Sequence, residues 1–265
     1  MTLRMGNREM LRLKHRQLLG GKHNKLMFNY FLKVLRSSSE MAQSYEALLS
    51  NLHLLNSTEP LKILLVTSAQ PGEGKTTVTI NLVLTAALAG MKGLVIDTDL
   101  RRPQLHHIFN LENTLGFTDV LTGNLSIRDT IQIIKLSDDP LQDKQTVGVI
   151  TSGKVSPNSF SIVSSPNLNK HIDSLRTIYD LVLLDTPPVL SVSDTLLLAP
   201  VVDGIILVVN TGVVPARDTR LMKERIEQAG GHIIGVVMNR FNEKIHGPSF
   251  HPYSSYYYDS TLSIP

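Results

Sequence analysis

The sequence predicts a doubly wound α/β domain with a mainly parallel β-sheet, and two observations carry this prediction. Short apolar segments without polar alternation recur along the chain, as expected of strands that are buried on both faces. Helical patterns separate several of these segments, and strands that alternate with helices usually run parallel. The predicted strands are residues 62–67, 93–97, 147–151, 181–185, 204–209 and 233–238.

The helices between and before these strands are recognised by apolar residues at helical spacing. The first follows three serines that can cap it, and a segment ending in Pro60 breaks it. The second follows a glycine-rich turn after the first strand. The pattern of alternating elements stops at Asn242, where turn formers and aromatic residues take over. The predicted helices are residues 40–55, 75–89, 167–176 and 216–229.

Composition narrows the class of protein. The chain has 265 residues, 42% hydrophobic and 18% charged, which is typical of a globular protein and excludes a disordered or fibrous one. No apolar run approaches the ~20 residues of a bilayer-spanning helix, and no apolar core follows the basic N-terminus as in a secretory signal. The chain has no cysteine, so disulfides and thiolate chemistry are excluded and we expect a cytoplasmic protein.

The positive charge is concentrated at the N-terminus. Residues 1–36 hold nine Lys or Arg and one Glu, a net charge of +8, whereas the remainder holds 17 basic and 22 acidic residues. We expect either a solvated, partly helical extension or a segment that contacts an anionic membrane surface or an acidic partner. Nucleic acid is disfavoured, since no aromatic residue is interleaved with the basic ones before Phe28.

These patterns divide the chain into three parts. We predict a basic N-terminal arm at residues 1–40, the α/β domain at 41–245 and a tyrosine-rich tail at 246–265.

Residues 69–77 form a phosphate-binding loop of the type [G/A]-x4-G-K-[S/T], placed between a predicted strand and a predicted helix. Gly72 and Gly74 let successive backbone N–H groups face an anion, and the helix adds the positive end of its dipole. Lys75 can reach the β- and γ-phosphates of a nucleotide, and the Thr76 hydroxyl can ligate Mg²⁺. The strand and helix context makes an accidental match improbable.

Two acidic segments follow buried strands. Asp97 and Asp99 stand at the end of one strand, and alternation in an extended chain turns them to the same side. Asp185 closes a second buried strand and is placed to hold the water shell of a metal ion. Each aspartate alone could merely cap a helix, but together with the phosphate-binding loop the paired carboxylates indicate a Mg²⁺ site or a base.

With these three motifs the sequence resembles the bacterial tyrosine kinases that govern capsule and exopolysaccharide export, P-loop proteins related to the MinD and ParA ATPases. The family's Walker A motif matches residues 69–77, its Walker A′ motif residues 94–101 and its Walker B motif residues 181–188. Pro71 stands where the MinD and ParA relatives usually keep a second lysine, which favours the kinase branch.

The resemblance implies roles for individual residues. Asp99 and Asp185, with Thr76, would position Mg²⁺, and Asp97 would be the base that accepts the proton of a tyrosine hydroxyl. An ordinary strand-end turn explains the dipeptide at 239–240 as well as an adenine contact does. The residues implied in ATP binding are Gly72, Glu73, Gly74, Lys75, Thr76, Thr77, Asn239 and Arg240.

The C-terminal segment contains four of the seven tyrosines within six positions. Such a cluster is a natural substrate for autophosphorylation, and the alternative is a strap that buries aromatic rings against the domain. The candidate phosphoacceptors are Tyr253, Tyr256, Tyr257 and Tyr258.

The chain departs from the family at one interface. Members usually carry E-x-x-R-x-x-R on the helix before the first strand, where it supports ring assembly, but the aligned positions here read Gln43, Glu46 and Leu49. We therefore expect a chain that is monomeric or only weakly associated.

The function predicted from the sequence is an ATP- and Mg²⁺-dependent protein-tyrosine autokinase that acts in polysaccharide synthesis and export. We expect a separate membrane protein to recruit and activate it at the inner face of the cell membrane, and copies of the chain to phosphorylate each other. Two alternatives stay open: a MinD- or ParA-like ATPase that positions cargo, and a nucleotide-binding adaptor that has lost catalysis.

Overall fold

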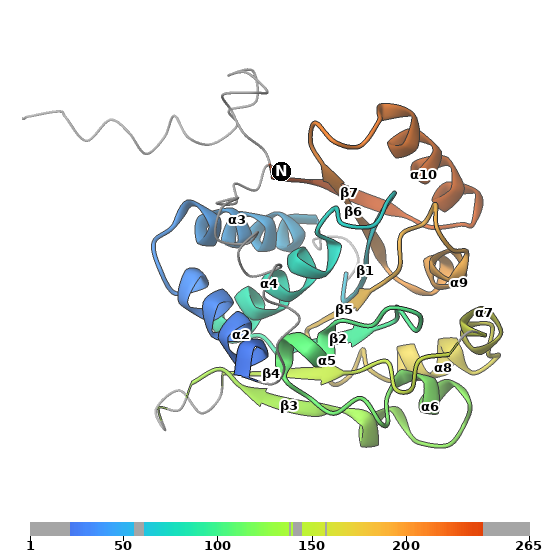
Figure 1. Ribbon diagram of the computed structural model, residues 1–265, viewed down its shortest axis with the longest axis horizontal. Coiled ribbons are helices and arrows are strands. Elements are labelled where there is room, and N and C mark those ends of the chain that lie inside the picture. Colours follow the sequence, from blue (N-terminus) through green and yellow to red (C-terminus); the bar gives the residue numbers. More distant parts are fainter. Residues whose placement is uncertain (1–21, 56–60, 138, 140–144, 157, 241–265) are drawn as a thin grey trace, which may run out of the picture.

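The part of the chain that the structure describes folds into a seven-stranded sheet with helices on both faces (Figure 1). The computed structural model describes residues 22–55, 61–137, 139, 145–156 and 158–240, with side chains from residue 27 onward. The strand order is β3-β4-β2-β5-β1-β6-β7. All neighbouring strands in it run parallel except β3, which pairs antiparallel with β4. The strands are β1 (Ile63–Ser68), β2 (Gly93–Asp97), β3 (Gln132–Lys135), β4 (Thr146–Ile150), β5 (Leu181–Asp185), β6 (Gly204–Asn210) and β7 (Ile233–Asn239).

Each face of the sheet has its own hydrophobic core, because successive strand residues point to opposite sides. Leu64 and Val66 of β1 belong to one core, and Ile63 and Leu65 belong to the other. The first core is covered by α2 (Lys22–Leu35), α3 (Glu40–Leu55), α4 (Lys75–Leu88) and α5 (Leu105–Phe109). The second is covered by α6 (Phe117–Leu121), α7 (Ser159–Val163), α8 (Leu168–Asp173), α9 (Asp194–Leu198) and α10 (Ala216–Gln228). Two short 3₁₀ helices, η1 (Ile127–Thr130) and η3 (Ala199–Val201), complete the second layer.

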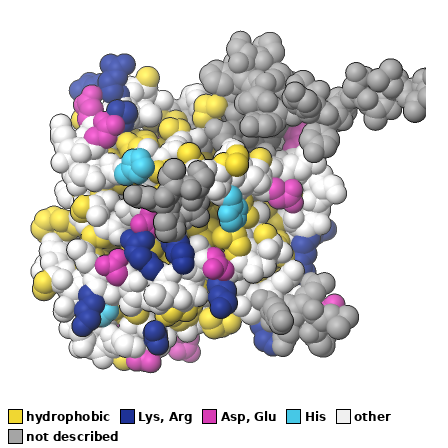
Figure 2. All heavy atoms as spheres, turned by 180° about the vertical axis from the view of Figure 1, so that it is seen from behind, with side chains coloured by type: hydrophobic (Ala, Val, Ile, Leu, Met, Phe, Trp, Pro, Cys, Tyr) yellow, Lys and Arg dark blue, Asp and Glu magenta, His cyan; other side chains and the backbone are white. Residues whose placement is uncertain are grey.

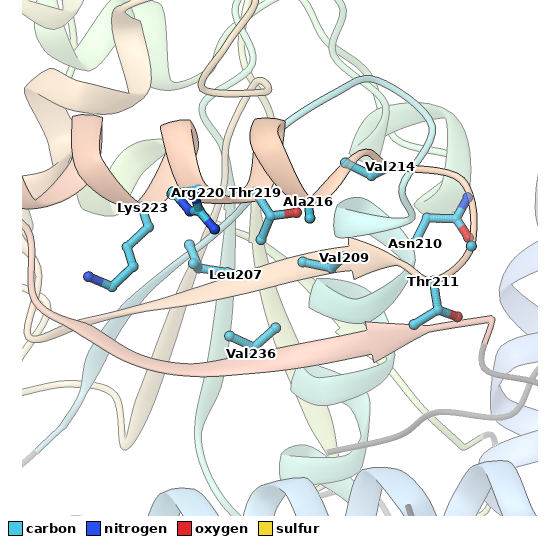
Figure 3. A pocket seen from close by; sticks show the side chains of 11 residues that line it. Leu207, Val209, Asn210, Thr211, Val214, Ala216, Thr219, Arg220, Lys223 and Val236 are labelled. Carbon is cyan, nitrogen blue, oxygen red and sulfur yellow. The ribbon is translucent and has the colours of Figure 1, made fainter. Parts of the chain in front are cut away.

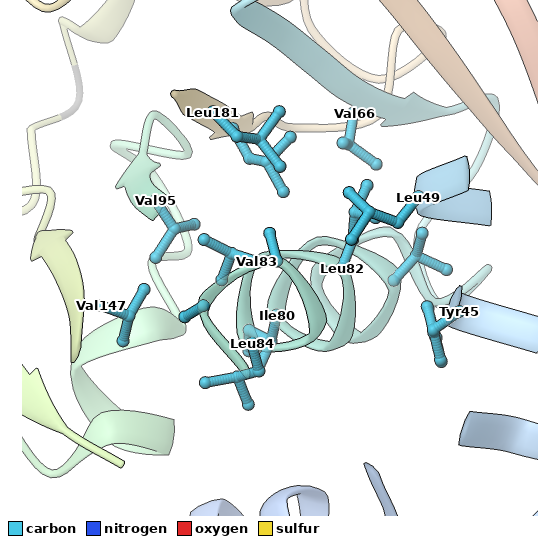
Figure 4. Close-up of a cluster of buried hydrophobic side chains, with 14 of the residues drawn as sticks. Tyr45, Leu49, Val66, Ile80, Leu82, Val83, Leu84, Val95, Val147 and Leu181 are labelled. Carbon is cyan, nitrogen blue, oxygen red and sulfur yellow. The ribbon is translucent and has the colours of Figure 1, made fainter. Parts of the chain in front are cut away.

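Helix α4 is the central element of the first core. It is almost entirely buried, with Leu82 facing α3 and Val83 facing the strands (Figure 4). Tyr45 of α3 is fully buried against it, and Asn81 of α4 donates a hydrogen bond of 3.3 Å to the Tyr45 hydroxyl. The buried polar side chains of this helix, Thr79, Asn81 and Thr85, each donate a hydrogen bond to a backbone carbonyl one turn earlier, so their burial leaves these donors satisfied. The α4 N-terminus is therefore held rigidly at the edge of the sheet.

The predicted fold class is confirmed. All six predicted strands are present, each within one residue of its expected bounds, and helices 40–55, 75–89 and 216–229 are present within one residue as well. The helix expected at 167–176 is shorter, since α8 ends at Asp173 and turns follow it. Strand β3 was not predicted, because four residues with Gln132 and Lys135 at their ends give too short an apolar pattern.

Helix α2 changes the domain boundary placed at residue 40. Its residues Phe31, Leu32 and Leu35 are buried in the first core, and Phe28 contacts Phe109 of α5 with ring centroids 5.5 Å apart. The segment from residue 27 onward is thus part of the packed domain and not of a separate arm. Residues 1–21 and the tyrosine-rich tail lie outside the described residues.

Surface charge is mixed on the one face of the molecule that Figure 2 shows. On the face opposite to that of Figure 1, Lys and Arg side chains stand beside Asp and Glu side chains (Figure 2). None of the helices that the structure describes combines the length and the apolar character needed to cross a membrane.

Candidate nucleotide and phosphoryl-transfer site

The phosphate-binding loop connects the end of β1 to the first turn of α4. Gly72 and Gly74 have φ angles of +84° and +96°, in the left-handed region that glycine adopts without a steric penalty. Lys75, Thr76 and Thr77 form the first turn of α4, where backbone N–H groups lack intrahelical partners. The loop therefore has the backbone shape and the dipole orientation of an anion site.

The loop is fastened to the neighbouring strands by Glu73, which is 2% exposed. Its carboxylate accepts hydrogen bonds from the backbone N–H of Gln70 at 2.6 Å and of Asn210 at 3.1 Å. Its carbonyl accepts a bond of 2.7 Å from the Asn239 side chain. Burial raises the pKa of Glu73 against the opposing effect of these backbone hydrogen bonds. A Cβ on Gly74 would lie only 2.0 Å from Asn239 Nδ2, so loop and strand end are in close contact.

Asn239 and Arg240 were expected on the adenine side of a nucleotide. The structure brings Asn239 to the phosphate-binding loop, fully buried, and uses both ends of its amide: Oδ1 accepts the Arg240 N–H at 2.9 Å. Arg240 has a positive φ of +56°. Asn239 is thus a brace between β7 and the loop, which the sequence did not indicate.

Asp97 is fully buried at the end of β2. One oxygen accepts the backbone N–H of Asp99 at 3.2 Å, and the other accepts those of Gln104 and Leu105, both at 2.9 Å. Burial, followed by repulsion from Asp185, raises the pKa of Asp97 to about 8. Its carboxylate therefore fixes the segment that carries Asp99 and also holds a proton more readily than an ordinary aspartate.

Asp185 lies beside Asp97, since the two residues are register partners in the parallel pair β2–β5. Burial raises its pKa to about 6, against the charge of Lys75 and hydrogen bonding by the Thr76 hydroxyl. Within the described residues its Oδ1 is buried without a hydrogen-bond partner. An orphaned anionic oxygen beside a phosphate-binding loop fits a metal ion or its bound water.

Asp99 completes the acidic group. It is 8% exposed, and its Oδ1 accepts the backbone N–H of Arg102 at 2.9 Å. Its charge raises the pKa values of both Asp97 and Asp185, so the three carboxylates lie within electrostatic reach of one another. The structure therefore brings together the five residues expected at the reacting centre: Lys75, Thr76, Asp97, Asp99 and Asp185.

The described residues contain no group of three or more His, Asp or Glu side chains arranged to hold a metal by themselves. Mg²⁺ rarely needs such a cage, because it usually keeps several waters and binds substrate phosphates along with one or two carboxylates. The Thr76 hydroxyl and the carboxylates of Asp99 and Asp185 form a donor set of this kind.

A second polar cluster beside the site was missed. Arg101 Nε donates to Ser159 Oγ at 2.8 Å, and this hydroxyl donates to Asp194 Oδ2 at 2.5 Å. Ser159 and Asp194 are buried, whereas the Arg101 side chain is 43% exposed. Arg101 belongs to the Walker A′ pattern, but nothing in the sequence connected it with residues 58 and 93 positions away.

The helix that carries the altered assembly motif is α3. Gln43 and Glu46 are exposed on it, whereas Leu49 is buried in the first core. Leu49 is therefore a packing residue.

Comparison with known proteins agrees with this geometry. The family of CobQ/CobB/MinD/ParA nucleotide binding domains matches residues 64–255. Tyrosine-protein kinase YwqD of Bacillus subtilis is 33% identical over 198 residues, which cover 75% of this chain and 80% of the relative. The kinase domain of the Escherichia coli tyrosine kinase ETK superimposes with a TM-score of 0.75 at 30% identity, covering 90% of this chain and 88% of that one. The septum site-determining protein MinD of Pyrococcus horikoshii, solved with Mg-ADP, superimposes with a TM-score of 0.56 at 26% identity and covers 69% and 71%.

The fold and the site define a P-loop nucleotide-binding domain of the CobQ/CobB/MinD/ParA class. Within that class the chain belongs to the bacterial tyrosine-protein kinases, and it is a tyrosine kinase that uses a nucleotide. The resemblance seen in the three motifs is thereby confirmed.

Proposed function

We propose that this kinase transfers the γ-phosphoryl group of Mg·ATP to the tyrosines of its own C-terminal segment. The observation that carries the proposal is the meeting of Asp97, Asp99 and Asp185 with Lys75 and Thr76 at one edge of the sheet. Phosphoryl transfer requires little covalent help, so a site that positions the reactants and neutralises charge is sufficient.

The metal and phosphates would be held by three kinds of group. Thr76, Asp99 and Asp185 would hold Mg²⁺, and the unpartnered Oδ1 of Asp185 supports this assignment. A Mg²⁺ ion held by these residues would supply positive charge against the negative charge of the phosphates. Lys75 and the loop N–H groups would bind the phosphates. The loop already has the shape of an anion site, so binding would not have to order it and would cost less conformational entropy.

Asp97 would act as the base toward the tyrosine hydroxyl. Its raised pKa of about 8 suits a group that takes up a proton near neutral pH. The Asp97 carboxylate can accept about four hydrogen bonds, and three backbone N–H groups occupy three of these positions. One position is therefore left for the tyrosine hydroxyl. Because the side chain is buried, the loop from Thr98 to Gln104 has to shift to admit the acceptor.

The acceptors, the partner and the cellular role follow from the resemblance. Tyr253, Tyr256, Tyr257 and Tyr258 would be phosphorylated between copies of the chain. A membrane protein of the polysaccharide synthesis and export system would activate the kinase at the inner face of the membrane. The basic residues at 1–36 would add attraction to anionic lipid, at about 1 kcal/mol for each one near the surface.

The test is incubation of the full chain with Mg·ATP, followed by mass spectrometry of phosphotyrosine. We expect phosphate on the four tail tyrosines of the wild-type chain and none above background for Lys75→Ala, since the variant lacks the charge at the β- and γ-phosphates. The matched control is Lys92→Ala, an exposed lysine just before β2 at the opposite edge of the sheet. Turnover of ATP without any phosphotyrosine would instead support the MinD-like ATPase, and wild-type labelling of Lys75→Ala would contradict the site.

A further inference from the structure

A groove outside the phosphate-binding loop lies between α10 and the last two strands (Figure 3). Its volume of about 580 Å³ falls within the rough range of 300–1,000 Å³ seen for small-ligand sites. We call it the β6–α10 groove. Its lining residues are Leu207, Val209, Asn210, Thr211, Gly212, Val214, Ala216, Thr219, Arg220, Lys223 and Val236.

The floor of the groove is apolar and suits a flat ring. Leu207 and Val209 of β6 and Val236 of β7 point toward α10 (Figure 3). Val236 is 42% exposed, which is high for a valine in the middle of a strand. Leu207 is buried beneath the floor, so an aromatic side chain laid on Val209 and Val236 would remove apolar surface on both partners from water.

One wall of the groove is positively charged. Arg220 and Lys223 of α10 line it, and no acidic side chain is among the lining residues. Lys223 is engaged by Glu227 one turn away, at 2.7 Å. Arg220 is exposed and forms no ion pair with the described residues, so its guanidinium is available to an anion. An apolar floor beside a free guanidinium matches a ligand that carries an aromatic ring and a phosphate.

The C-terminal segment begins next to this groove. The backbone N–H of Thr211, a lining residue, donates to the carbonyl of Asn239 at 3.2 Å, and Asn239 is the last residue of β7. Val236 stands three residues before that point, about 10 Å along the strand. Tyr253 follows Arg240 by 13 residues, which span up to about 44 Å when extended. The chain between Arg240 and a tail tyrosine is therefore longer than the distance back to the groove of the same chain.

We propose that the β6–α10 groove binds a phosphotyrosine of the chain's own C-terminal segment, with the ring on the floor and the phosphate on Arg220. The inference rests on the proposed function only for the origin of the phosphate. Binding within one chain benefits from a short tether, which gives an effective concentration on the order of millimolar. The groove would then hold a phosphorylated tail beside the catalytic edge after transfer.

Two hydrogen bonds connect the elements that form the groove to the phosphate-binding loop. Asp218 of α10 accepts a hydrogen bond of 3.2 Å from the Gln70 side chain, and Asn210 at the groove's end donates to Glu73. A ligand that shifts α10 would therefore act on residues that shape the nucleotide site.

The experiment uses the full chain with all four tail tyrosines changed to Phe, so that its own tail carries no phosphate. A synthetic peptide of residues 250–262 with phosphate on Tyr256, and its unphosphorylated twin, are titrated by fluorescence anisotropy. We expect the phosphopeptide to bind about tenfold tighter than the twin, and Arg220→Glu to abolish that preference. Arg225→Glu, an exposed residue of α10 that does not line the groove, should keep it.

Since the phosphate is installed by synthesis, the result does not depend on whether the chain is an autokinase. Equal affinity for the two peptides would overturn the proposal. So would phosphopeptide binding that survives Arg220→Glu, because the peptide would then sit elsewhere, for example at the catalytic carboxylates as a reaction product. If Arg220→Glu and Arg225→Glu lose the preference for the phosphopeptide equally, the preference arises from the overall charge of α10. That result would also contradict binding in the groove.

Discussion

Asp97 and Asp185 are buried side by side at a cost in folding free energy. Burial takes both carboxylates out of water and is the main cause of their raised pKa values. Repulsion from Asp185 contributes to the pKa of about 8 at Asp97, and repulsion from Asp99 contributes to the pKa of about 6 at Asp185. A packed domain gains nothing in stability from such a pair. In the proposed function, a bound cation would offset this cost, because it would reduce the repulsion between the carboxylates.

The first prediction concerns pH and Asp185→Asn. Between the ordinary aspartate pKa of about 3.9 and the raised values, Asp97 and Asp185 hold more protons in the metal-free native protein than in the unfolded chain, so their contribution to stability is fully present below about pH 3.9 and is lost as the pH rises through the raised values. The free energy of unfolding should therefore fall as pH rises toward 8. Asp185→Asn should be more stable than the wild type at pH 8 by about 1–3 kcal/mol in EDTA, because it removes one buried charge.

The measurement is urea denaturation at several pH values, with Mg·ADP as the counterpart condition. Mg·ADP should stabilise the wild type and have little effect on Asp185→Asn. A variant that is less stable than the wild type at pH 8, or one that keeps the full effect of Mg·ADP, would refute the assignment of Asp185.

At the scale of elements, the phosphate-binding loop is shaped by its glycines and by its braces to β6 and β7. Gly72 and Gly74 both have a positive φ, but a Cβ on Gly72 would meet no atom within 4 Å, whereas one on Gly74 would meet Asn239 Nδ2 at 2.0 Å. A side chain at position 72 would therefore introduce backbone strain alone, whereas one at position 74 would introduce backbone strain and a steric clash. They form a matched pair for substitution.

We predict that Gly74→Ala lowers ATP affinity far more than Gly72→Ala. Gly72→Ala should cost about 1–2 kcal/mol of stability from strain alone, and Gly74→Ala should also displace Asn239 from the Glu73 carbonyl. Calorimetric titration with ATP and thermal unfolding would measure both effects. Equal losses in the two variants would mean that the brace does not shape the loop.

The elements of this protein were predictable to different degrees. Buried parallel strands such as β5 form apolar runs, and the carboxyl ends of parallel strands meet at one edge, so the grouping of Asp97, Asp99 and Asp185 followed from the sequence. The hydrogen bonds of Asp97 to Gln104 and Leu105 did not, because they depend on the path of an irregular loop.

Helix α2 was misjudged for a different reason. Its apolar residues were present in the sequence, but the high positive charge around them suggested a solvated arm. Only the tertiary structure shows that Phe31, Leu32 and Leu35 complete the first core. High local charge therefore does not predict that a helix is solvated when one face of the helix is apolar and packs against the domain.

At the scale of the whole molecule, this packing predicts that α2 unfolds together with the kinase domain. Phe31 is 3% exposed, so Phe31→Ala should reduce the free energy of unfolding by about 3–5 kcal/mol. Asn29→Ala, an exposed position on the same helix, should change it little. Denaturation followed by circular dichroism would show one transition, and an unchanged midpoint for Phe31→Ala would mean that α2 is an independent arm after all.

The arrangement of the whole sheet also bears on how the tail meets a catalytic site. Strand β7 is parallel to β6, so it ends at the same edge as the acidic group, and four strand spacings of about 4.8 Å separate it from β2. Tyr258 follows Arg240 by 18 residues, a reach of up to about 60 Å. Reach alone therefore permits transfer within one chain and between two chains.

We predict that transfer occurs between chains, as the family resemblance implies. Each phosphate adds about −1.5 to −2 charge, so phosphorylated tails would repel one another and loosen any assembly that brought the chains together. The experiment mixes Lys75→Ala, inactive with an intact tail, with an active chain whose four tail tyrosines are changed to Phe. Mass spectrometry should find phosphate on Tyr253, Tyr256, Tyr257 or Tyr258 of the inactive chain. If that tail stays unmodified while wild-type chains label themselves under the same conditions, each chain phosphorylates its own tail and the prediction is wrong.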